Sequence, residues 1–371
     1  MDVRRLLLGL AAHGLPTTVA LPDEPPSGQE WRRLRSAVRI ERLTGPASAA
    51  ADAGALVLTD EQRQELEEEH VAAMAHVVRL EAGLLRIHDV LGAAGVPVVV
   101  LKGTAVAHLD YADPQARAFG DVDILLPTGQ FAEGVAALLD HGYVRPSAGL
   151  GPGFDARFGK GATLVGPETC ELDVHRTFAM GPFGMMVRLE ELWEHPACFE
   201  LGGRELHALD TEQRYLHACY HAVIGNNTRR VQPYRDVAEM LLYGAHDPAR
   251  LRRLAAHWSA EVVLARAVVE TWDALGLTEE GPLLAWARGR VPTRREERLL
   301  GVYGRGTSYA AKAVAGLTVL PGWRDRVAYA RMLALPDRQH ARATGGSRVG
   351  RLFRGARRVA RDTRRVRTGR R

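Results

Sequence analysis

Cysteine is scarce in this chain of 371 residues, which contains only Cys170, Cys198 and Cys219. Three widely spaced cysteines are too few for a disulfide framework or for a cysteine-rich zinc site. A chain of this kind suits a reducing compartment, so we expect a cytoplasmic protein.

Long apolar runs are also missing. The longest uncharged stretch near the middle, residues 90–101, holds twelve residues, whereas a membrane-spanning helix needs about 18 or more. Near the N-terminus the apolar run Leu6–Ala12 is short, and no clear small-residue cleavage site follows it. We interpret this run as part of a first helix and expect no transmembrane segment.

Lysine is rare as well: the chain has 49 basic residues, of which only Lys102, Lys160 and Lys312 are lysines. The charge is unevenly distributed. Residues 338–371 hold thirteen arginines and one acid, a net charge of +12, whereas the whole chain carries +5, so the preceding residues carry about −7. The sequence therefore predicts a mildly acidic body with a basic tail.

The remaining composition is that of a folded protein. Hydrophobic residues make up 46% of the chain and charged residues 25%, which excludes a wholly disordered polypeptide. At roughly 100–200 residues per domain, the length allows two or three structural units.

Residue periodicity divides the chain into four regions. Residues 1–95 have helical patterns, the last of them introduced by a capping-box sequence at Thr59. Residues 96–188 mix strands with helices, residues 189–337 have mainly helical patterns, and residues 338–371 form the arginine-rich tail. The expected fold class is α/β, with a mixed sheet core flanked by N-terminal and C-terminal helical regions.

Four strands are expected in the core. The β-branched run at residues 96–101 is typical of a buried strand, and residues 121–126 form a second strand that Pro127 ends. Residues 170–175 pair with residues 163–165 as a hairpin.

Asp121 and Asp123 are the centre of the functional prediction. Residues two apart on a strand share a face, so both carboxylates project to one side while Val122 and Ile124 face the core. Adjacent carboxylates repel each other unless a cation lies between them, and hard oxygen ligands of this kind suit Mg²⁺. By this reasoning, replacing Asp123 with Asn costs the metal-free protein little stability, because a repulsion disappears.

The strand at residues 170–175 repeats the pattern, because Glu171, Asp173 and His175 share one face. If this strand lies next to that of Asp123, Asp173 completes a three-carboxylate cluster. Such a cluster holds two divalent ions about 3.5–4 Å apart, which clamp the attacking and leaving oxygens of a phosphoryl group. His175 then either contacts a substrate or is an ordinary histidine on the sheet.

A turn, Lys102-Gly103-Thr104, joins the first strand to a predicted helix at residues 105–111. Gly103 lets the backbone approach a phosphate closely, and the free N–H groups of a helix beginning near Thr104 favour an anion. Lys102 adds a positive charge. The turn is therefore a candidate nucleotide-binding element.

These segments together resemble the signature of the uncharacterised bacterial nucleotidyltransferases, a family of the DNA polymerase beta-like nucleotidyltransferase superfamily. The matching segments are Leu101-Lys-Gly-Thr-Ala105, Leu109-Asp-Tyr-Ala-Asp-Pro114, Arg117-Ala-Phe-Gly-Asp-Val-Asp-Ile-Leu125 and Leu172-Asp-Val-His175. The resemblance spans roughly residues 30–245 and is most specific in residues 96–126.

The resemblance implies a nucleotidyltransferase fold in which a glycine-containing turn holds nucleotide phosphates and three carboxylates bind two Mg²⁺ ions, with Mn²⁺ as an alternative. These roles fall on Gly103, Asp121, Asp123 and Asp173. Such an enzyme moves an NMP from an NTP, here expected to be ATP, to an acceptor and releases pyrophosphate. The sequence leaves the acceptor open among small molecules, peptides, proteins and RNA.

Further basic residues are weaker candidates. Arg117 precedes the aspartate pair and is a candidate nucleotide contact. Arg230 and Arg235 either reach phosphates from the helical region or pair with nearby acids. His217 and His221 are four residues apart on a predicted helix, which suits a metal, but with no third ligand in view a packing or pocket-lining role is favoured.

A second hypothesis keeps the fold but not the catalysis. A non-catalytic binding protein would hold its partner through the acidic cleft or through the basic tail. Apolar residues recur at helical spacing among the arginines of residues 338–371, which suits nucleic acid or an anionic membrane surface. The alternative for these residues is a solvated, disordered tail.

Removing residues 338–371 tests the division between body and tail. We expect the shortened protein to keep its folding transition, while binding to nucleic acid or to anionic vesicles falls sharply, because the net charge changes from +5 to about −7. Circular dichroism and a salt titration of binding measure the two effects. Unfolding of the shortened protein would show that the tail belongs to the folded body.

Overall fold

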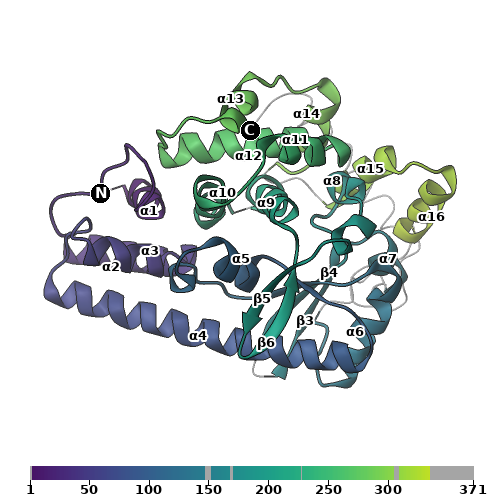
Figure 1. Cartoon of the computed structure of the whole chain (residues 1–371), viewed down its shortest axis with the longest axis horizontal. Coiled ribbons are helices and arrows are strands. Elements are labelled where there is room, and N and C mark those ends of the chain that lie inside the picture. The colour runs from purple at the N-terminus through teal and green to yellow at the C-terminus, as the bar shows by residue number, and fades with distance from the viewer. Residues whose placement is uncertain (1, 147–151, 168–169, 227, 305–308, 335–371) are drawn as a thin grey trace.

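In the computed structural model, six strands form one mixed sheet (Figure 1). The structure describes residues 2–146, 152–167, 170–226, 228–304 and 309–334. The predicted tail, with its helical pattern, lies outside these residues. The strands run in the order β3-β4-β2-β1-β6-β5 across the sheet. Their bounds are β1 Val99–Val100, β2 Val122–Leu125, β3 Gly161–Val165, β4 Glu171–His175, β5 Ala197–Leu201 and β6 Arg204–Ala208.

The register of the central strands aligns the candidate residues. β2 and β4 are parallel neighbours, and Asp123 lies opposite Asp173 while Leu125 lies opposite His175. β3 and β4 form the predicted antiparallel hairpin. Because β2 and β4 are adjacent, the predicted condition for bringing Asp173 to Asp123 is met.

One face of the sheet is covered by α4 (Asp60–Ala93) and α6 (Phe131–Asp140). The predicted capping box at Thr59 begins α4, where the Thr59 hydroxyl accepts a hydrogen bond from the N–H of Gln62. Val122 and Ile124 face this side and lie in its apolar core. The alternation predicted for β2 is therefore confirmed.

The opposite face is covered by helices from both ends of the chain. α5 (Lys102–Asp110), α9 (Thr211–Tyr220), α10 (Gln232–Tyr243) and α12 (Glu261–Leu275) lie on this side (Figure 1). α1 (Val3–Ala12) joins the same core by packing on α10 and α12. Helices near the start and the end of the described chain therefore share one apolar core.

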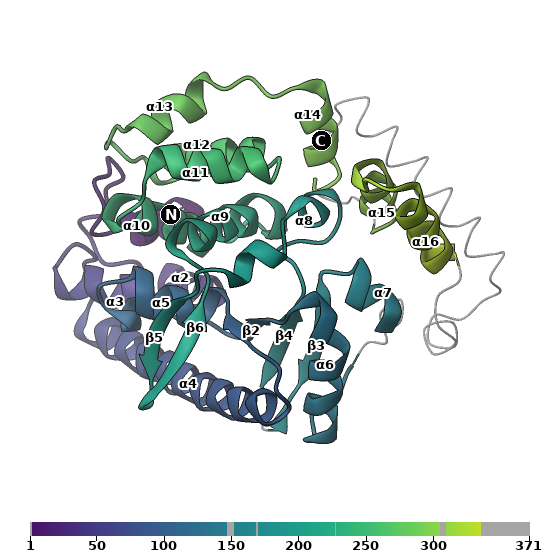
Figure 2. The ribbon, with the colours of Figure 1, turned by 45° about the vertical axis from the view of Figure 1, so that its right-hand side comes forward.

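A third, smaller core joins α7 (Pro152–Arg157) to α15 (Tyr309–Val319) and α16 (Trp323–Ala334), at one side of the sheet (Figure 2). Phe154 and Phe158 pack there against Tyr329. The other helices are α2 Gly28–Glu41, α3 Thr44–Asp52, α8 Pro182–Met186, α11 Pro248–His257, α13 Pro282–Gly289 and α14 Arg294–Gly301. Shorter turns of helix are η1 Pro114–Ala116, η2 Thr128–Gln130, η4 Glu190–Trp193 and the π-type η5 His221–Gly225.

The hairpin of β5 and β6 is the main feature that the sequence prediction missed. The expectation of helices from residue 189 onward is wrong for this segment, which pairs with β1 and extends the sheet. Gly202 and Gly203, both at positive φ, form its two-residue turn, as favoured hairpin turns require. The signal was present as alternating apolar residues around a Gly-Gly pair, but the helical patterns on either side outweighed it.

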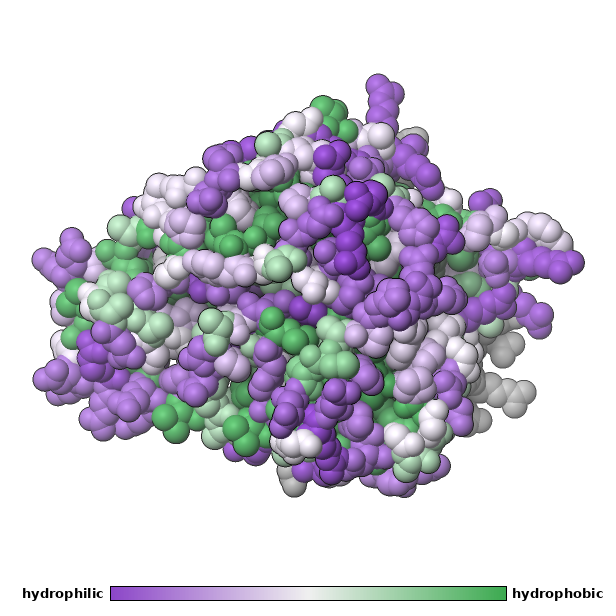
Figure 3. All heavy atoms as spheres, in the orientation of Figure 1, coloured by the Kyte–Doolittle hydropathy of each residue, from purple (hydrophilic) through white to green (hydrophobic). Residues whose placement is uncertain are grey.

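Among the described residues, no helix combines the length and the apolar character that crossing a membrane requires. Hydrophilic residues are spread among smaller apolar areas on the face drawn in Figure 3. Cys170, Cys198 and Cys219 all lie among the described residues, and none of them forms a disulfide.

A buried ion pair fastens α5 to α9. The Nε and Nη2 atoms of Arg214 donate to both oxygens of Asp110 at 2.6 and 2.8 Å, and both side chains are about 5% exposed. Replacing Asp110 with Asn leaves a buried guanidinium without its counter-charge, so we expect the free energy of unfolding to fall by about 3–5 kcal/mol.

Urea denaturation measures this loss. The matched control is Asp89→Asn, since Asp89 pairs with Arg204 and both side chains are about half exposed. That control should cost less than about 1 kcal/mol. Equal losses in the two variants would contradict the importance of the buried pair.

Candidate functional site

Three side chains from β2 and β4 converge on the face of the sheet that α5 and α9 cover. Asp123 is 4% exposed and His175 is 1% exposed, and the Nε2 of His175 lies 2.7 Å from Oδ1 of Asp123. Asp173 stands beside them with its Oδ2 3.9 Å from the same Nε2. The three residues can present ligand atoms within 4.8 Å of one another. Parallel pairing of β2 with β4 thus builds a compact O, O, N donor group.

The Lys102-Gly103 turn brings a cation onto this group. Lys102 Nζ lies 2.6 Å from Oδ1 of Asp123. The backbone bends sharply here, with φ of +34° at Lys102 and a non-helical Gly103. A Cβ at Gly103 would lie 3.2 Å from the ring of Phe119. The regular part of α5 therefore begins at the buried Thr104, as the sequence predicted.

The other two predicted carboxylates also have basic partners. Asp173 accepts a hydrogen bond of 2.6 Å from the Thr163 hydroxyl and lies 3.6 Å from Lys160 Nζ. Asp121 precedes β2 and lies 3.4 Å from Nη1 of Arg42. The donor group described above contains His175 and does not include Asp121.

The surrounding charges set the protonation states of Asp123, Lys102 and His175. Burial by itself would raise the pKa of Asp123, but Lys102 and the hydrogen bond from His175 outweigh it and hold that pKa well below its usual range. Burial would likewise lower the pKa of Lys102, but Asp123 and Asp121 outweigh it and raise that pKa. Burial and the nearby Lys160 lower the pKa of His175. At neutral pH the group therefore holds an ionised aspartate, a charged lysine and a neutral histidine.

Arg117 supports the turn from inside the fold. Its Nε and Nη2 donate to Asp236 at 2.8 Å each, and its Nη1 donates to the carbonyl of Gly103 at 3.0 Å. Tyr111 completes the network by donating to Asp236 at 2.9 Å. All three guanidinium nitrogens of Arg117 have protein partners, so its contribution to nucleotide binding would come through the position of Gly103.

Arg235 also lies in a packed position. It pairs with Glu239 at 2.6 Å and donates to the carbonyls of Ala11 and His13, so it joins α10 to the end of α1. Of the two roles that the sequence left open for Arg235, the structure thus shows pairing with an acid, within a link between two helices.

The two histidines of the predicted His217 and His221 pair are not in the donor group. His217 stacks on Phe178 at 4.4 Å between ring centroids and lies 6.4 Å from His175. Burial and Lys102 lower the pKa of His221 to about 3. Burial and Lys102 also hold the pKa of His217 well below its usual range, so His217 is a neutral packing residue on the helical side of the site, in agreement with the favoured interpretation.

Sequence reasoning missed Arg42, Lys160 and Thr163 as neighbours of the carboxylates. One signal could have identified Lys160. Arginine serves almost everywhere as the basic residue of this chain, and two of its three lysines, Lys102 and Lys160, lie at the aspartates. A compact ammonium group, unlike the forked guanidinium, can act as a point charge between carboxylates.

The donor group suits one divalent cation. Two carboxylates are the ligands that Mg²⁺ and Mn²⁺ prefer, and an added imidazole favours the transition metal of the two. A second ion would need Asp121, which here pairs with Arg42. The residues present therefore fit a divalent ion, although basic side chains already lie on the same oxygens.

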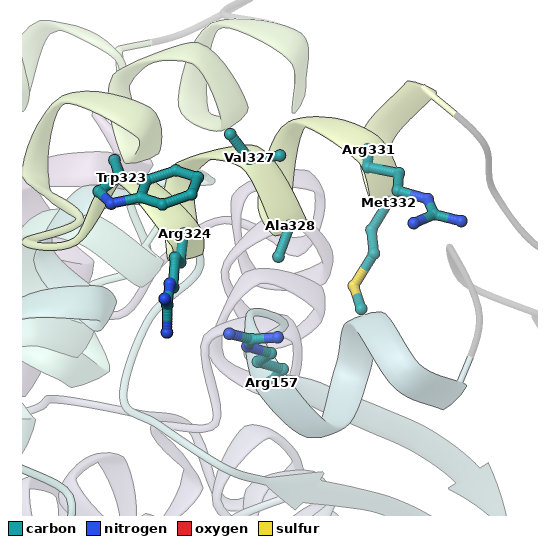
Figure 4. A pocket seen from close by; sticks show the side chains of 7 residues that line it. All are labelled: Arg157, Trp323, Arg324, Val327, Ala328, Arg331 and Met332. Atoms are coloured by element: carbon teal, nitrogen blue, oxygen red, sulfur yellow. The ribbon is translucent and has the colours of Figure 1, made fainter.

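A separate hollow of about 560 Å³ lies between α7 and α16 (Figure 4). Its lining combines Arg157, Arg324 and Arg331 with apolar groups, among them Trp323, which is 71% exposed. None of the candidate catalytic residues lines it. Guanidinium groups around an exposed indole suit an anionic partner with flat groups.

Comparison with known proteins gives the chain a family. Residues 27–269, well over half of the sequence, match the family described as uncharacterised nucleotidyltransferase, so the chain belongs to that family. The predicted family is confirmed, and so is the α/β fold class, a mixed sheet with flanking helices. None of the curated proteins compared with the chain is a match.

Two solved structures show weak similarity. The structure of ANT(2")-Ia in complex with adenylyl-2"-tobramycin is 16% identical, with a TM-score of 0.32, over 48% of this chain and 97% of that one. The antigenic nucleotidyltransferase-like protein from Paracoccidioides brasiliensis is 14% identical, with a TM-score of 0.36, over 56% and 96% of the two chains. Similarity at these levels carries no residue role from either protein to this chain.

The Lys102–Asp123 pair changes what an Asp123→Asn substitution should do to the metal-free protein. The sequence alone suggested relief of a repulsion, but the structure pairs Asp123 with Lys102 and His175 in a buried position. We now expect the substitution to lower the free energy of unfolding by about 3–5 kcal/mol, because Lys102 stays buried without its counter-charge.

Denaturant unfolding without metal is the measurement. The control is Asp121→Asn, whose pair with Arg42 is about 30% exposed and should contribute about 1 kcal/mol or less. A more stable Asp123→Asn variant would restore the repulsion argument and contradict the ion pair.

Proposed function

From membership of this nucleotidyltransferase family and from the donor group, we propose that the chain transfers an NMP from an NTP to an acceptor and releases pyrophosphate. The observation that carries the proposal is the convergence of Asp123, Asp173 and His175, on neighbouring parallel strands, beside the Lys102-Gly103 turn. The proposed donor is ATP, and the proposed compartment is the cytoplasm, where free cysteines remain reduced.

Asp123, Asp173 and His175 would hold a divalent ion, Mg²⁺ or Mn²⁺. Such an ion neutralises charge on the phosphates and on the transition state when it is bound. The two-ion arrangement expected from the resemblance remains part of the proposal, with Asp121 as the added ligand once its pair with Arg42 opens.

The Lys102-Gly103 turn would receive the phosphates. The first N–H groups of a helix generally lack helical partners and favour an anion, so the start of α5 suits a phosphate. Arg117 holds the carbonyl of Gly103 from the other side at 3.0 Å, so the turn is rigid before the nucleotide arrives. Hydrogen-bond donors that are already held in place need not rearrange when negative charge develops on the phosphates in the transition state.

The reaction would join an acceptor oxygen to the α-phosphorus as the bond to pyrophosphate breaks, and pyrophosphate leaves with that electron pair. We assign the acceptor's proton to Asp173, the more exposed of the two facing carboxylates. The acceptor, whether small molecule, peptide, protein or RNA, would enter from the helical side, where His217 and Phe178 stack.

An anionic partner is a further part of the proposal. The hollow with Arg157, Trp323 and Arg331 lies on α16, the last described helix before the arginine-rich residues 338–371. The two features would together attract nucleic acid or an anionic surface to this side of the molecule.

The rival function is that of a non-catalytic binding protein of the same fold. It is favoured by the ion pairs that already satisfy Asp121, Asp123 and Asp173. A pseudo-enzyme of this kind would bind an anionic partner with no need of a divalent ion. Dependence on Mg²⁺ or Mn²⁺ therefore separates the two functions.

Thermal unfolding with each of the four NTPs, with and without Mg²⁺, tests the proposal. We expect Mg²⁺ and an NTP together to raise the melting temperature more than either alone, because only the complex matches both the carboxylates and the turn. Stabilisation should be accompanied by transfer of label from the α-³²P NTP to a component of cell extract.

An absence of stabilisation with every NTP, under both Mg²⁺ and Mn²⁺, would count against the enzyme. Transfer by wild type that persists unchanged in Asp173→Asn would remove Asp173 from the mechanism while leaving the activity established.

A further inference from the structure

The three aspartates are matched one to one by basic side chains. In each pair a carboxylate lies within 4 Å of a different cation. The pairs are Asp121 with Arg42 at 3.4 Å, Asp123 with Lys102 at 2.6 Å, and Asp173 with Lys160 at 3.6 Å. The three basic side chains therefore balance the negative charges of the three aspartates. Glu171, at the edge of the cluster, is an additional carboxyl group that interacts electrostatically with all three aspartates.

This balance of charges weakens the binding of a divalent ion in the absence of a nucleotide. The ion would have to displace an ammonium or guanidinium group from an oxygen, and the displaced cation would stay nearby and repel it. A metal site that works without a co-ligand normally gathers uncompensated carboxylates. The pairing therefore needs an explanation beyond metal binding.

Two of the three cations also lie close together. Lys102 and Lys160 are close enough for each to affect the other electrostatically, and only the carboxylates make that proximity favourable. A nucleotide triphosphate is a compact, multiply charged anion. Arg42 and Lys160 have side chains about one third exposed, so both can turn toward a ligand without disrupting the core.

We propose that Arg42, Lys102 and Lys160 are triphosphate-binding residues that exchange partners, leaving the aspartates for the phosphates when metal and nucleotide enter together. This inference rests on the proposed function and adds Arg42 and Lys160 to its binding site. Metal and nucleotide then bind cooperatively, since each releases the groups that the other requires. Without nucleotide, the three ion pairs weaken the binding of free divalent ions.

The proposed exchange of partners predicts that a single substitution strengthens the binding of the metal alone and weakens the binding of the metal–nucleotide complex. Lys160→Gln frees Asp173, so the variant should bind Mn²⁺ alone about three- to tenfold more tightly than wild type, the size expected for a partly exposed charge pair. The same variant should bind Mg²⁺ with α,β-methylene-ATP about tenfold more weakly, because one phosphate contact is lost. A merely structural role for Lys160 would weaken both or change neither.

The measurements use the full chain: the electron paramagnetic resonance signal of free Mn²⁺ for the metal alone, and calorimetry for the metal–nucleotide complex. Arg42→Gln is the second variant, with the same two expected signs. Arg266→Gln is the control, since it removes one positive charge from a surface pair with Glu270 on α12 and should alter neither affinity.

The outcomes separate the exchange from the function itself. If wild type binds the metal–nucleotide complex but neither variant tightens Mn²⁺ binding, the exchange is wrong and the proposed function stands. If wild type binds no metal–nucleotide complex, the proposed function and the exchange both fail.

Discussion

The contact between Lys102 and Asp123 is the interaction on which the site depends. A buried ammonium and a buried carboxylate each carry a large desolvation cost, and the 2.6 Å contact between them, with His175 as a second donor, offsets that cost. The contact is possible only because the backbone bends at Gly103. Arg117 in turn fixes that bend through the carbonyl of Gly103. Fold and site are therefore coupled through a few polar atoms in an otherwise apolar core.

Local patterns were enough to predict the central strands. Residues 121–126 and 170–175 alternate, end at turn signals and carry carboxylates on one face, and each of these features depends only on near neighbours in sequence. The sequence could not show whether β2 and β4 are neighbours, and the tertiary structure shows that they are. The β5–β6 hairpin was missed because its short alternation stood among long helical patterns.

The basic partners of the aspartates could not be derived in the same way. Arg42 and Asp121 are 79 positions apart, and Arg117 and Asp236 are 119 apart, so no periodicity links them. Among 46 arginines, charge alone does not distinguish the one that meets a given acid. The prediction of repulsion between Asp121 and Asp123 was reasonable for isolated carboxylates, but it reversed in sign once long-range partners supplied positive charge.

The shared core of the N-terminal and C-terminal helices has a consequence for how the chain reaches its fold. α1 packs on α10 and α12, and Thr17 pairs with Leu277 across the same junction. During synthesis α2 and α3 can cover part of the first helix early, but its contacts with α10 and α12 form only after most of the chain has been made. Contacts so distant in sequence slow folding and leave apolar surface exposed in the meantime. Closing this junction is consequently expected to follow the local packing of α1 with α2 and α3.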